Sequence, residues 1–312
     1  MKYGAILIDA LNLLYRLREQ QNEATLVSSK YVYRDLVVRY ISYIDALQDL
    51  HLHKDGTIYF LFDHSPSQHD QGRSYRNIGR KAIDSRYKEN RQRDSKEFYN
   101  TFDLIKYYYL TNKPRFVSLQ AQGYEADDLV KPLLRYIIPT SSRVLLLTND
   151  YDWTRYLSER VDWLPKLAQE PASVQDFIDT KGYLPTEHSV LIYKAVFGDR
   201  SDNISSILSE SPKHVDEMIE ILSEPDINID TIIKRSFDSK NLATSPIYKA
   251  IHEYEKQFRI NVQLIEPVPI TEQHLESILC VGRDSEVATS AVETAIGLRK
   301  EERVFVFGNI KT

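Results

Sequence analysis

The chain has 312 residues, of which 42% are hydrophobic and 27% are charged, so it can bury a genuine core and lacks the composition of a disordered chain. Its one cysteine, Cys280, excludes a disulfide within the chain and a cysteine-rich zinc module. The net charge of −5 is unevenly distributed, because the segment 73–115 carries 12 Lys and Arg residues against five Asp and Glu residues. Such a basic segment on an acidic body suits a protein that meets phosphates with cations and metals with carboxylates.

The N-terminal residues contain one short apolar run, which ends at Asp9. The run is too short for a signal sequence or a membrane span. We therefore expect no targeting segment, no membrane association and a reduced, cytoplasmic setting.

Short apolar runs that alternate with helical patterns predict an α/β fold with a mostly parallel sheet covered on both faces. In chain order, strands are expected at 5–8, 58–62, 115–119, 144–147 and 161–164, and helices at 31–50, 83–112 and 125–137. Pro132 lies inside the last of these helices and is expected to kink it. The stretch 63–82 is poor in large apolar residues and is expected to be a loop that leads into the basic helix.

The strand patterns stop near residue 185, and helical patterns follow at 186–197, 212–223, 228–236 and 246–260. Gly182 and Pro185 punctuate the chain at this point. We therefore expect an α/β domain at 1–182 and a mainly helical region at 183–312. The tail 262–312 carries no recognisable motif.

An aspartate directly follows each of the three strongest strands: Asp9, Asp63, and then Asp150 with Asp152. A single aspartate at a strand end is usually a turn or helix-cap residue. Ligands of open α/β sheets, however, bind outside the carboxyl ends of the strands. Three such ends with carboxylates therefore predict a site at this edge of the sheet.

Two further acidic groups are expected to join this edge. Glu125, Asp127 and Asp128 lie at the start of a predicted helix, where the helix dipole accounts for one or two of them but not for three in four residues. Asp199 and Asp202 are three residues apart, on one side of a helical turn. Nine carboxylates without Cys or His at ligand spacing favour hard divalent cations, Mg²⁺ or Mn²⁺, and their number suggests two metal sites that act together in phosphodiester hydrolysis.

Six motifs that contain these residues occur in the order typical of one family: Ile8–Asn12, Leu61–Asp63, Arg86–Arg91, Glu125–Asp128, Thr148–Trp153 and Gly198–Ile204. In this order and spacing the chain resembles the 5′-nuclease superfamily, which comprises flap endonucleases, the 5′-nuclease domain of bacterial DNA polymerase I and phage 5′→3′ exonucleases. The resemblance covers about two-thirds of the chain. It implies a PIN-like sheet, a basic helical arch at about 64–112 and a helix-hairpin-helix-like element at about 198–223.

The resemblance also implies roles for single residues. The ligands of the first metal would be Asp9, Asp63, Glu125, Asp127 and Asp150, and those of the second Asp152, Asp199 and Asp202, with Asp128 and Asp150 near both. Lys88 and Arg91 match the arch residues that contact the scissile phosphate, Lys88 as a point charge and Arg91 as a bidentate donor. Further contacts to nucleic acid are expected from Arg80, Lys81, Arg86 and Tyr87.

One departure from the family concerns the hairpin after residue 204. In most members this turn is rich in glycine and binds K⁺, whereas this chain has Ser206, Ser209 and Ser211 at the glycine positions. Glycine permits positive φ angles there, so we do not expect K⁺ binding. Ser211 and Pro212 still predict the start of a helix, which with Lys213 could meet a phosphate. The ribonuclease H of T-even phages similarly lacks these glycines and is the member closest in style, which suggests a phage replication enzyme.

The expected function is a 5′→3′ exonuclease and flap endonuclease of replication or repair, a monomer that acts on DNA with 5′ flaps, nicks or ends and on RNA–DNA hybrids. Two alternatives stay open at this point. A PIN-type ribonuclease shares the sheet but is usually shorter and lacks the basic arch. A non-catalytic nucleic-acid clamp could descend from the same fold, although all nine acidic positions are filled. The sequence does not identify a sliding clamp, a single-strand-binding protein or any other partner.

Overall fold

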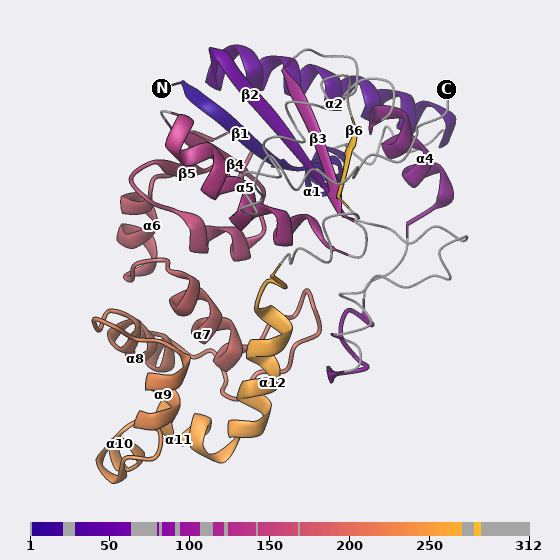
Figure 1. The fold of residues 1–312 in the computed structure, drawn as a ribbon. Coiled ribbons are helices and arrows are strands. Elements are labelled where there is room, and N and C mark those ends of the chain that lie inside the picture. Colours follow the sequence, from indigo (N-terminus) through magenta and orange to yellow (C-terminus); the bar gives the residue numbers. More distant parts are fainter. Residues whose placement is uncertain are drawn as a thin grey trace, which may run out of the picture.

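The computed structural model describes residues 2–20, 29–63, 80, 83–90, 94–106, 115–121, 124–141, 143–167, 169–269 and 278–281. A twisted sheet with helices on both faces forms one part of the molecule, and a group of helices lies below it (Figure 1). None of the described helices combines the length and the apolarity that crossing a membrane requires.

The sheet has six strands in the order β5-β4-β1-β2-β3-β6. These strands are β1 (Tyr3–Asp9), β2 (Leu52–Phe62), β3 (Phe116–Ala121), β4 (Val144–Leu147), β5 (Val161–Trp163) and β6 (Ile278–Val281). The first five are parallel and confirm the five strands expected from the apolar runs. The expectation that strands stop near residue 185 is wrong, because β6 returns to pair antiparallel with the edge strand β3. The four residues Ile278–Val281 form a strand because they pair with the free edge of β3, and the local sequence pattern does not reveal such a distant partner.

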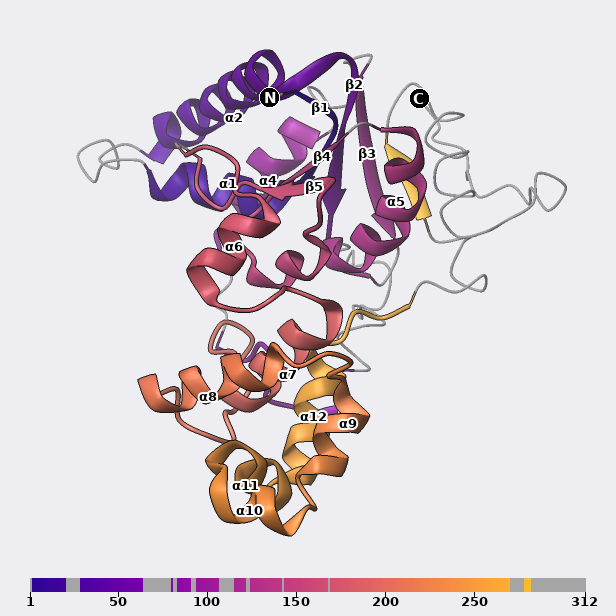
Figure 2. The ribbon, with the colours of Figure 1, turned by 90° about the vertical axis from the view of Figure 1, so that its left-hand side faces the viewer.

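Each face of the sheet is covered by its own helices (Figure 2). The helices α1 (Ala10–Glu19), α2 (Ser29–His51) and α4 (Lys96–Leu104) pack on one face, where Ile6 and Ile8 of β1 point. The helix α5 (Ala126–Thr140) and the 3₁₀ helix η4 (Tyr151–Tyr156) pack on the other face, against Ala5 and Leu7. The strict alternation along β1 explains why this strand is apolar throughout: both of its faces are buried.

The described residues cover only parts of the basic helix expected at 83–112. Within this stretch the described helix is α4, and residues 85–90 form turns instead. Lys88 has a φ of 55°, in the left-handed region that an α-helix does not contain. Most of the arch expected at 64–112 lies outside the described residues.

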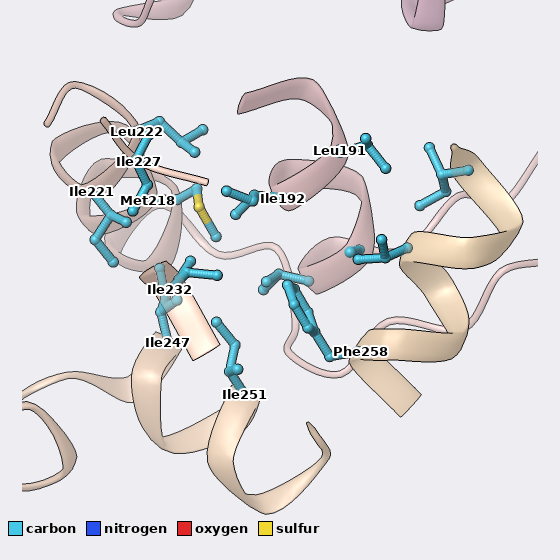
Figure 3. Packing of buried hydrophobic residues seen from close by; sticks show 14 of the residues in the cluster. Leu191, Ile192, Met218, Ile221, Leu222, Ile227, Ile232, Ile247, Ile251 and Phe258 are labelled. Carbon is cyan, nitrogen blue, oxygen red and sulfur yellow. The ribbon is translucent and has the colours of Figure 1, made fainter. Parts of the chain in front are cut away.

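The helical part contains α6 (Val174–Lys181), α7 (Glu187–Phe197), α8 (Pro212–Leu222), α9 (Ile229–Arg235), α10 (Ser239–Thr244), α11 (Pro246–Glu253) and α12 (Glu255–Ile265). The helices expected in this region are confirmed, except that 246–260 forms two helices separated at Tyr254. Ile192, Met218, Ile247 and Phe258 are among the side chains that meet in their common core (Figure 3).

Gly182 ends α6 in the left-handed conformation, with a φ of 81°. This is the usual helix terminator and agrees with the punctuation expected there. Phe177 and Tyr87 nevertheless belong to the same core as the helices after residue 182. The division into 1–182 and 183–312 therefore stays a prediction.

Candidate active site

Three carboxylates are delivered by the ends of three neighbouring strands. Asp9 is the last residue of β1, Asp63 follows β2, and Asp150 follows β4, and these strands are adjacent and parallel in the sheet. Asp9 and Asp150 also begin a helix each, because their side chains accept the backbone N–H of Asn12 at 3.0 Å and of Asp152 at 2.9 Å. The capping role and the site role are thus carried by the same residues.

The pKa values of these carboxyls show that they share one crowded environment. Burial raises the pKa of Asp63 to about 6, and the charge of Glu125 adds to the effect. Burial, together with Asp152 and Asp127, raises the pKa of Asp150 to about 8. The pKa of Asp9 also lies well above its usual value, because of burial and then the charges of Asp63 and Asp127. Carboxylates that repel one another in this way call for a cation.

The start of α5 adds the second acidic group. The backbone N–H of Ala126 donates to Asp63 at 2.8 Å and joins the helix start to the end of β2. Asp128 behaves differently from its neighbours, because one of its oxygens accepts the N–H of Glu125 at 3.0 Å and the other accepts the N–H of Val268 at 2.9 Å. The geometry therefore gives Asp128 a capping role that fixes the chain after α12, and its metal role stays a prediction.

The loop 198–204 brings the third acidic group from the end of α7. Gly198 has a φ of 79°, and a Cβ there would lie 2.6 Å from the carbonyl oxygen of Ile204, so glycine is required. Two backbone hydrogen bonds between Asp199 and Ile204, of 3.0 and 2.8 Å, close the loop. The turn so formed holds Asp199 and Asp202 with the rest of the acidic group.

A buried lysine that the sequence reasoning missed lies between two of these carboxylates. The Nζ of Lys194 on α7 is 2.6 Å from Asp152 and 2.5 Å from Asp199. Although burial lowers the pKa of Lys194, the attraction of Asp152, Asp150 and Asp199 outweighs it and raises the pKa above its usual range. Lys194 in turn lowers the pKa of Asp199 against the effect of burial. The signal in the sequence is a single charged residue within the apolar stretch 190–197.

Lys88 reaches into the other half of the acidic group. Its Nζ donates to both carboxylate oxygens of Glu125 at 2.8 Å and lies 3.9 Å from Asp202. Its backbone N–H donates to the carbonyl of Asp202 at 2.9 Å, which holds the residue in its left-handed conformation. A lysine kept in an unfavourable backbone conformation with its ammonium among carboxylates is typical of a functional position.

All nine predicted acidic residues are described, and they come together at the carboxyl edge of the sheet. Within the described part of the chain, however, no three His, Cys, Asp or Glu side chains form a set that could hold a metal ion as they stand. The lysine pairs and the helix caps occupy several of their oxygens. The donor chemistry fits a hard divalent cation, whereas the present side-chain positions would have to turn toward it.

The residues expected to contact nucleic acid separate into three groups. Arg80 and Tyr87 are 3% and 0% exposed, and Arg80 donates to the Tyr87 hydroxyl at 2.6 Å. Both side chains join the basic segment to the protein interior here, and a contact of either with nucleic acid stays a prediction. Arg86 is exposed and paired with Asp84 at 2.9 Å. Lys81 and Arg91 lie outside the described residues.

The serine-substituted hairpin lies between α7 and α8. Ser211 caps α8 by accepting the N–H of His214 at 3.3 Å, and Lys213 is exposed in the first turn. The non-glycine residues with positive φ in the described chain are Lys88, Asn203 and Asp226, so none of the three serines takes the conformation that glycine would permit. Whether this hairpin binds K⁺ stays a prediction.

Comparison with known proteins identifies the family and the fold. Residues 4–182 match the family described as 5′-3′ exonuclease, N-terminal resolvase-like domain. The DNA polymerase I of Rhizobium leguminosarum is 24% identical over 191 residues, which are 61% of this chain and 18% of that protein. The flap endonuclease of Escherichia phage T5 is 22% identical over 205 residues, 65% of this chain and 64% of that protein. The chain thus spans less than two-thirds of the length of these relatives.

Solved structures show the same fold. A protein of phage T5 that was co-crystallised with metal ions superimposes with a TM-score of 0.63 at 18% identity, over 94% of this chain and 96% of that one. A phage T5 5′-exonuclease with bound zinc gives a TM-score of 0.64 at 17% identity, over the same shares of the two chains. Together with the family match over more than half of its length, these findings show that the chain belongs to the 5′-3′ exonuclease family, through its N-terminal resolvase-like domain.

Proposed function

We propose that this chain is a metal-dependent 5′ nuclease that hydrolyses phosphodiester bonds near the 5′ ends of DNA strands. The observation that carries the proposal is the meeting of carboxylates from three parallel strand ends, the start of α5 and the loop 198–204, with Lys88 of the basic segment among them. Family membership and the phage T5 flap endonuclease among the relatives support the same reaction.

Two divalent cations, Mg²⁺ or Mn²⁺, are the proposed cofactors. The first would be held by Asp9, Asp63, Glu125, Asp127 and Asp150, and the second by Asp152, Asp199 and Asp202. A bound divalent cation lowers the pKa of water and neutralises charge that builds on phosphate oxygens. The pKa values of Asp63 and Asp150, raised by burial and by neighbouring carboxylates, support the proposal, because a bound cation would offset that repulsion. Asp128, whose oxygens cap backbone N–H groups, would support the site from behind.

Lys88 and Arg91 are proposed to stabilise the scissile phosphate. Lys88 already lies at the acidic group, and a phosphate that enters the site would compete with Glu125 for its ammonium. Removal of Lys88 from Glu125 frees carboxylate oxygens for a cation, so phosphate entry and metal binding would favour each other. Arg91 is assigned by its place in the motif alone.

The proposed substrates are DNA with 5′ flaps, nicks or ends, and RNA–DNA hybrids. A structure of the phage T5 flap endonuclease is a complex with DNA and metal ions, which supports DNA as the substrate here. The duplex would be bound at the start of α8, where the positive end of the helix dipole and the charge of Lys213 would meet phosphates. We further propose that the protein acts as a monomer in DNA replication or repair.

The direct test is cleavage of a 5′-labelled flap duplex with Mg²⁺ and with excess EDTA, at fixed ionic strength. We expect Mg²⁺-dependent release of short 5′ products and no cleavage in EDTA. Parallel nicked, gapped and RNA–DNA substrates rank the substrate classes. Asp127→Asn should abolish cleavage while duplex binding persists; cleavage at the wild-type rate by this variant would refute the site.

The same assay, with single-stranded RNA added to the substrates, distinguishes the proposed nuclease from the two alternatives. A PIN-type ribonuclease would cut single-stranded RNA without need of a 5′ DNA end. A non-catalytic clamp would bind flaps with Mg²⁺ and leave them intact. The filled acidic positions and the lysine at the acidic group favour the nuclease over both.

A further inference from the structure

The short helix η4 carries more than its two acidic residues. It is capped by Asp150 and includes Asp152, and Trp153 is buried in the core. Trp153 is 0% exposed and packs with Leu129 and other apolar residues of α5. A buried indole needs a partner for its N–H, because an unpaired donor in the core destabilises the fold.

The partner is one of the predicted metal ligands. The indole Nε1–H of Trp153 donates to Oδ1 of Asp127 at 2.6 Å. Asp127 is the second residue of α5, and its charge acts on Asp9, Asp63 and Asp150. One hydrogen bond therefore connects the acidic start of α5 with the helix that carries Asp150.

This contact is well suited to hold a carboxylate in place. The indole ring is enclosed by the core and has few ways to move, so the position of its N–H is fixed by packing rather than by solvent. A neutral donor takes one oxygen of Asp127 without adding a positive charge, and the carboxylate keeps its full negative charge for a cation. Donors of this kind behind a ligand typically change metal affinity when they are removed.

From this geometry we infer that Trp153 is a positioning residue that orients Asp127 for divalent metal binding. The environment of its indole, and so its fluorescence, should therefore change when a metal ion binds. The inference rests on the proposed function in so far as Asp127 is a metal ligand. Trp153 touches neither substrate nor metal and acts through Asp127 alone.

The chain offers a matched control. Its second tryptophan, Trp163, is partly buried, whereas Trp153 is fully buried, and the Nε1–H of Trp163 donates at 2.7 Å to the backbone carbonyl of Thr148 rather than to a carboxylate. Each single Trp→Phe variant removes one indole donor and leaves the other tryptophan as the sole indole fluorophore. The comparison therefore separates loss of the Asp127 contact from loss of an aromatic ring in general.

The experiment is calorimetric titration of the full chain with Mg²⁺ in the absence of nucleic acid, for wild type and both variants. We expect Trp153→Phe to weaken Mg²⁺ binding about 10- to 100-fold and Trp163→Phe to leave it unchanged within error. In the Trp163→Phe variant, the emission of Trp153 should change saturably with Mg²⁺, in parallel with the calorimetric curve. The emission of Trp163 in Trp153→Phe should not follow the metal.

A double-mutant cycle with Asp127→Asn distinguishes positioning from general stability. If Trp153 acts through Asp127, the two substitutions together weaken Mg²⁺ binding no more than Asp127→Asn alone, whereas independent effects would add. Equal Mg²⁺ affinity in wild type and Trp153→Phe overturns the inference. If Trp153→Phe does not fold, a Trp153 emission that ignores Mg²⁺ in the Trp163→Phe variant overturns it instead.

Failure of the proposed function gives a different result. Wild-type protein that binds no Mg²⁺ overturns both the metal dependence and the role of Trp153. If the wild type binds Mg²⁺ with an affinity that depends on Trp153 and Asp127 but cuts no flap, nick or hybrid, the proposed nuclease activity is refuted and the positioning role of Trp153 stands.

Discussion

Replacing Asp150 by asparagine should abolish cleavage and, in the absence of metal, make the protein more stable. The pKa of Asp150 is about 8 instead of its usual 3.8, because of burial and the charges of Asp152 and Asp127. Since one pKa unit corresponds to about 1.4 kcal/mol, the ionised folded state is disfavoured by up to roughly 5 kcal/mol at pH 8. Asp150 keeps some contact with water, so the realised gain in Asp150→Asn is about 1–2 kcal/mol.

The direction of the pH dependence follows from the same values. With pKa values of about 8 for Asp150 and about 6 for Asp63, the folded chain binds more protons than the unfolded chain between about pH 4 and pH 8. The stability of the metal-free wild type should therefore fall as the pH rises through this window. Asp150→Asn should flatten that fall. Its amide oxygen can still accept the N–H of Asp152, so the helix cap is kept.

The assay is urea unfolding in EDTA at pH 5 and pH 8, and again with Mg²⁺. A matched control is Asp162→Asn, because Asp162 is a buried carboxylate that accepts hydrogen bonds from Arg143 at 2.5 Å and from the Tyr3 hydroxyl at 2.8 Å. Removal of its charge leaves Arg143 poorly paired and should destabilise the fold by about 3 kcal/mol. Opposite signs for the two substitutions support the reasoning. An Asp150→Asn protein that is less stable than wild type in EDTA at pH 8 would refute it.

Three further outcomes are expected. Lys88→Ala should slow single-turnover cleavage by about 100-fold or more with little change in affinity for the DNA substrate, whereas Lys96→Ala, at an exposed position, should change neither quantity. Weaker binding at an unchanged rate would show that Lys88 only contacts a phosphate. Lys213→Ala should weaken the binding of all duplex substrates alike and reduce the slope of log affinity against log salt concentration by about one unit, and an unchanged slope would place the duplex contact elsewhere. Exchange of K⁺ for Na⁺ should not alter the affinity of the wild type for duplex. Gly198→Ala should lower the free energy of unfolding, measured in urea, by at least about 2 kcal/mol, because the new Cβ meets backbone atoms. Gly182→Ala should lower it by only about 1 kcal/mol, because the new Cβ there meets the side chain of Ile219. Equal losses would contradict the close backbone approach at Gly198.

The part of the fold that the sequence predicts is the part that depends on local pattern. The run of residues 5–8 is apolar on both faces, so a buried parallel strand follows, and the aspartate at its end must then lie at the edge of the sheet. The same reasoning applies to Asp63 and Asp150. The position of the carboxylates at this edge was predictable because each of them lies within a few residues of a strand end or a helix end.

The rest depends on contacts between distant segments. Lys194 reaches Asp152 across 42 positions of the chain, and Trp153 reaches Asp127 across 26, and no periodicity records such pairs. Arg80 and Tyr87 were expected to face nucleic acid because they belong to a basic segment. Their burial is decided by contacts with residues far along the chain, such as the carbonyl of Glu266 and the carboxylate of Asp202.

The antiparallel strand β6 has a consequence for how the two parts of the molecule are joined. The chain leaves the sheet after β5, builds the helices α6 to α12, and comes back to the opposite edge beside β3. In topological terms the helices are therefore an insertion, anchored at both ends to the same sheet rather than appended to it. A truncation before Ile278 would remove β6 and leave the backbone of β3 open to pairing with a second molecule.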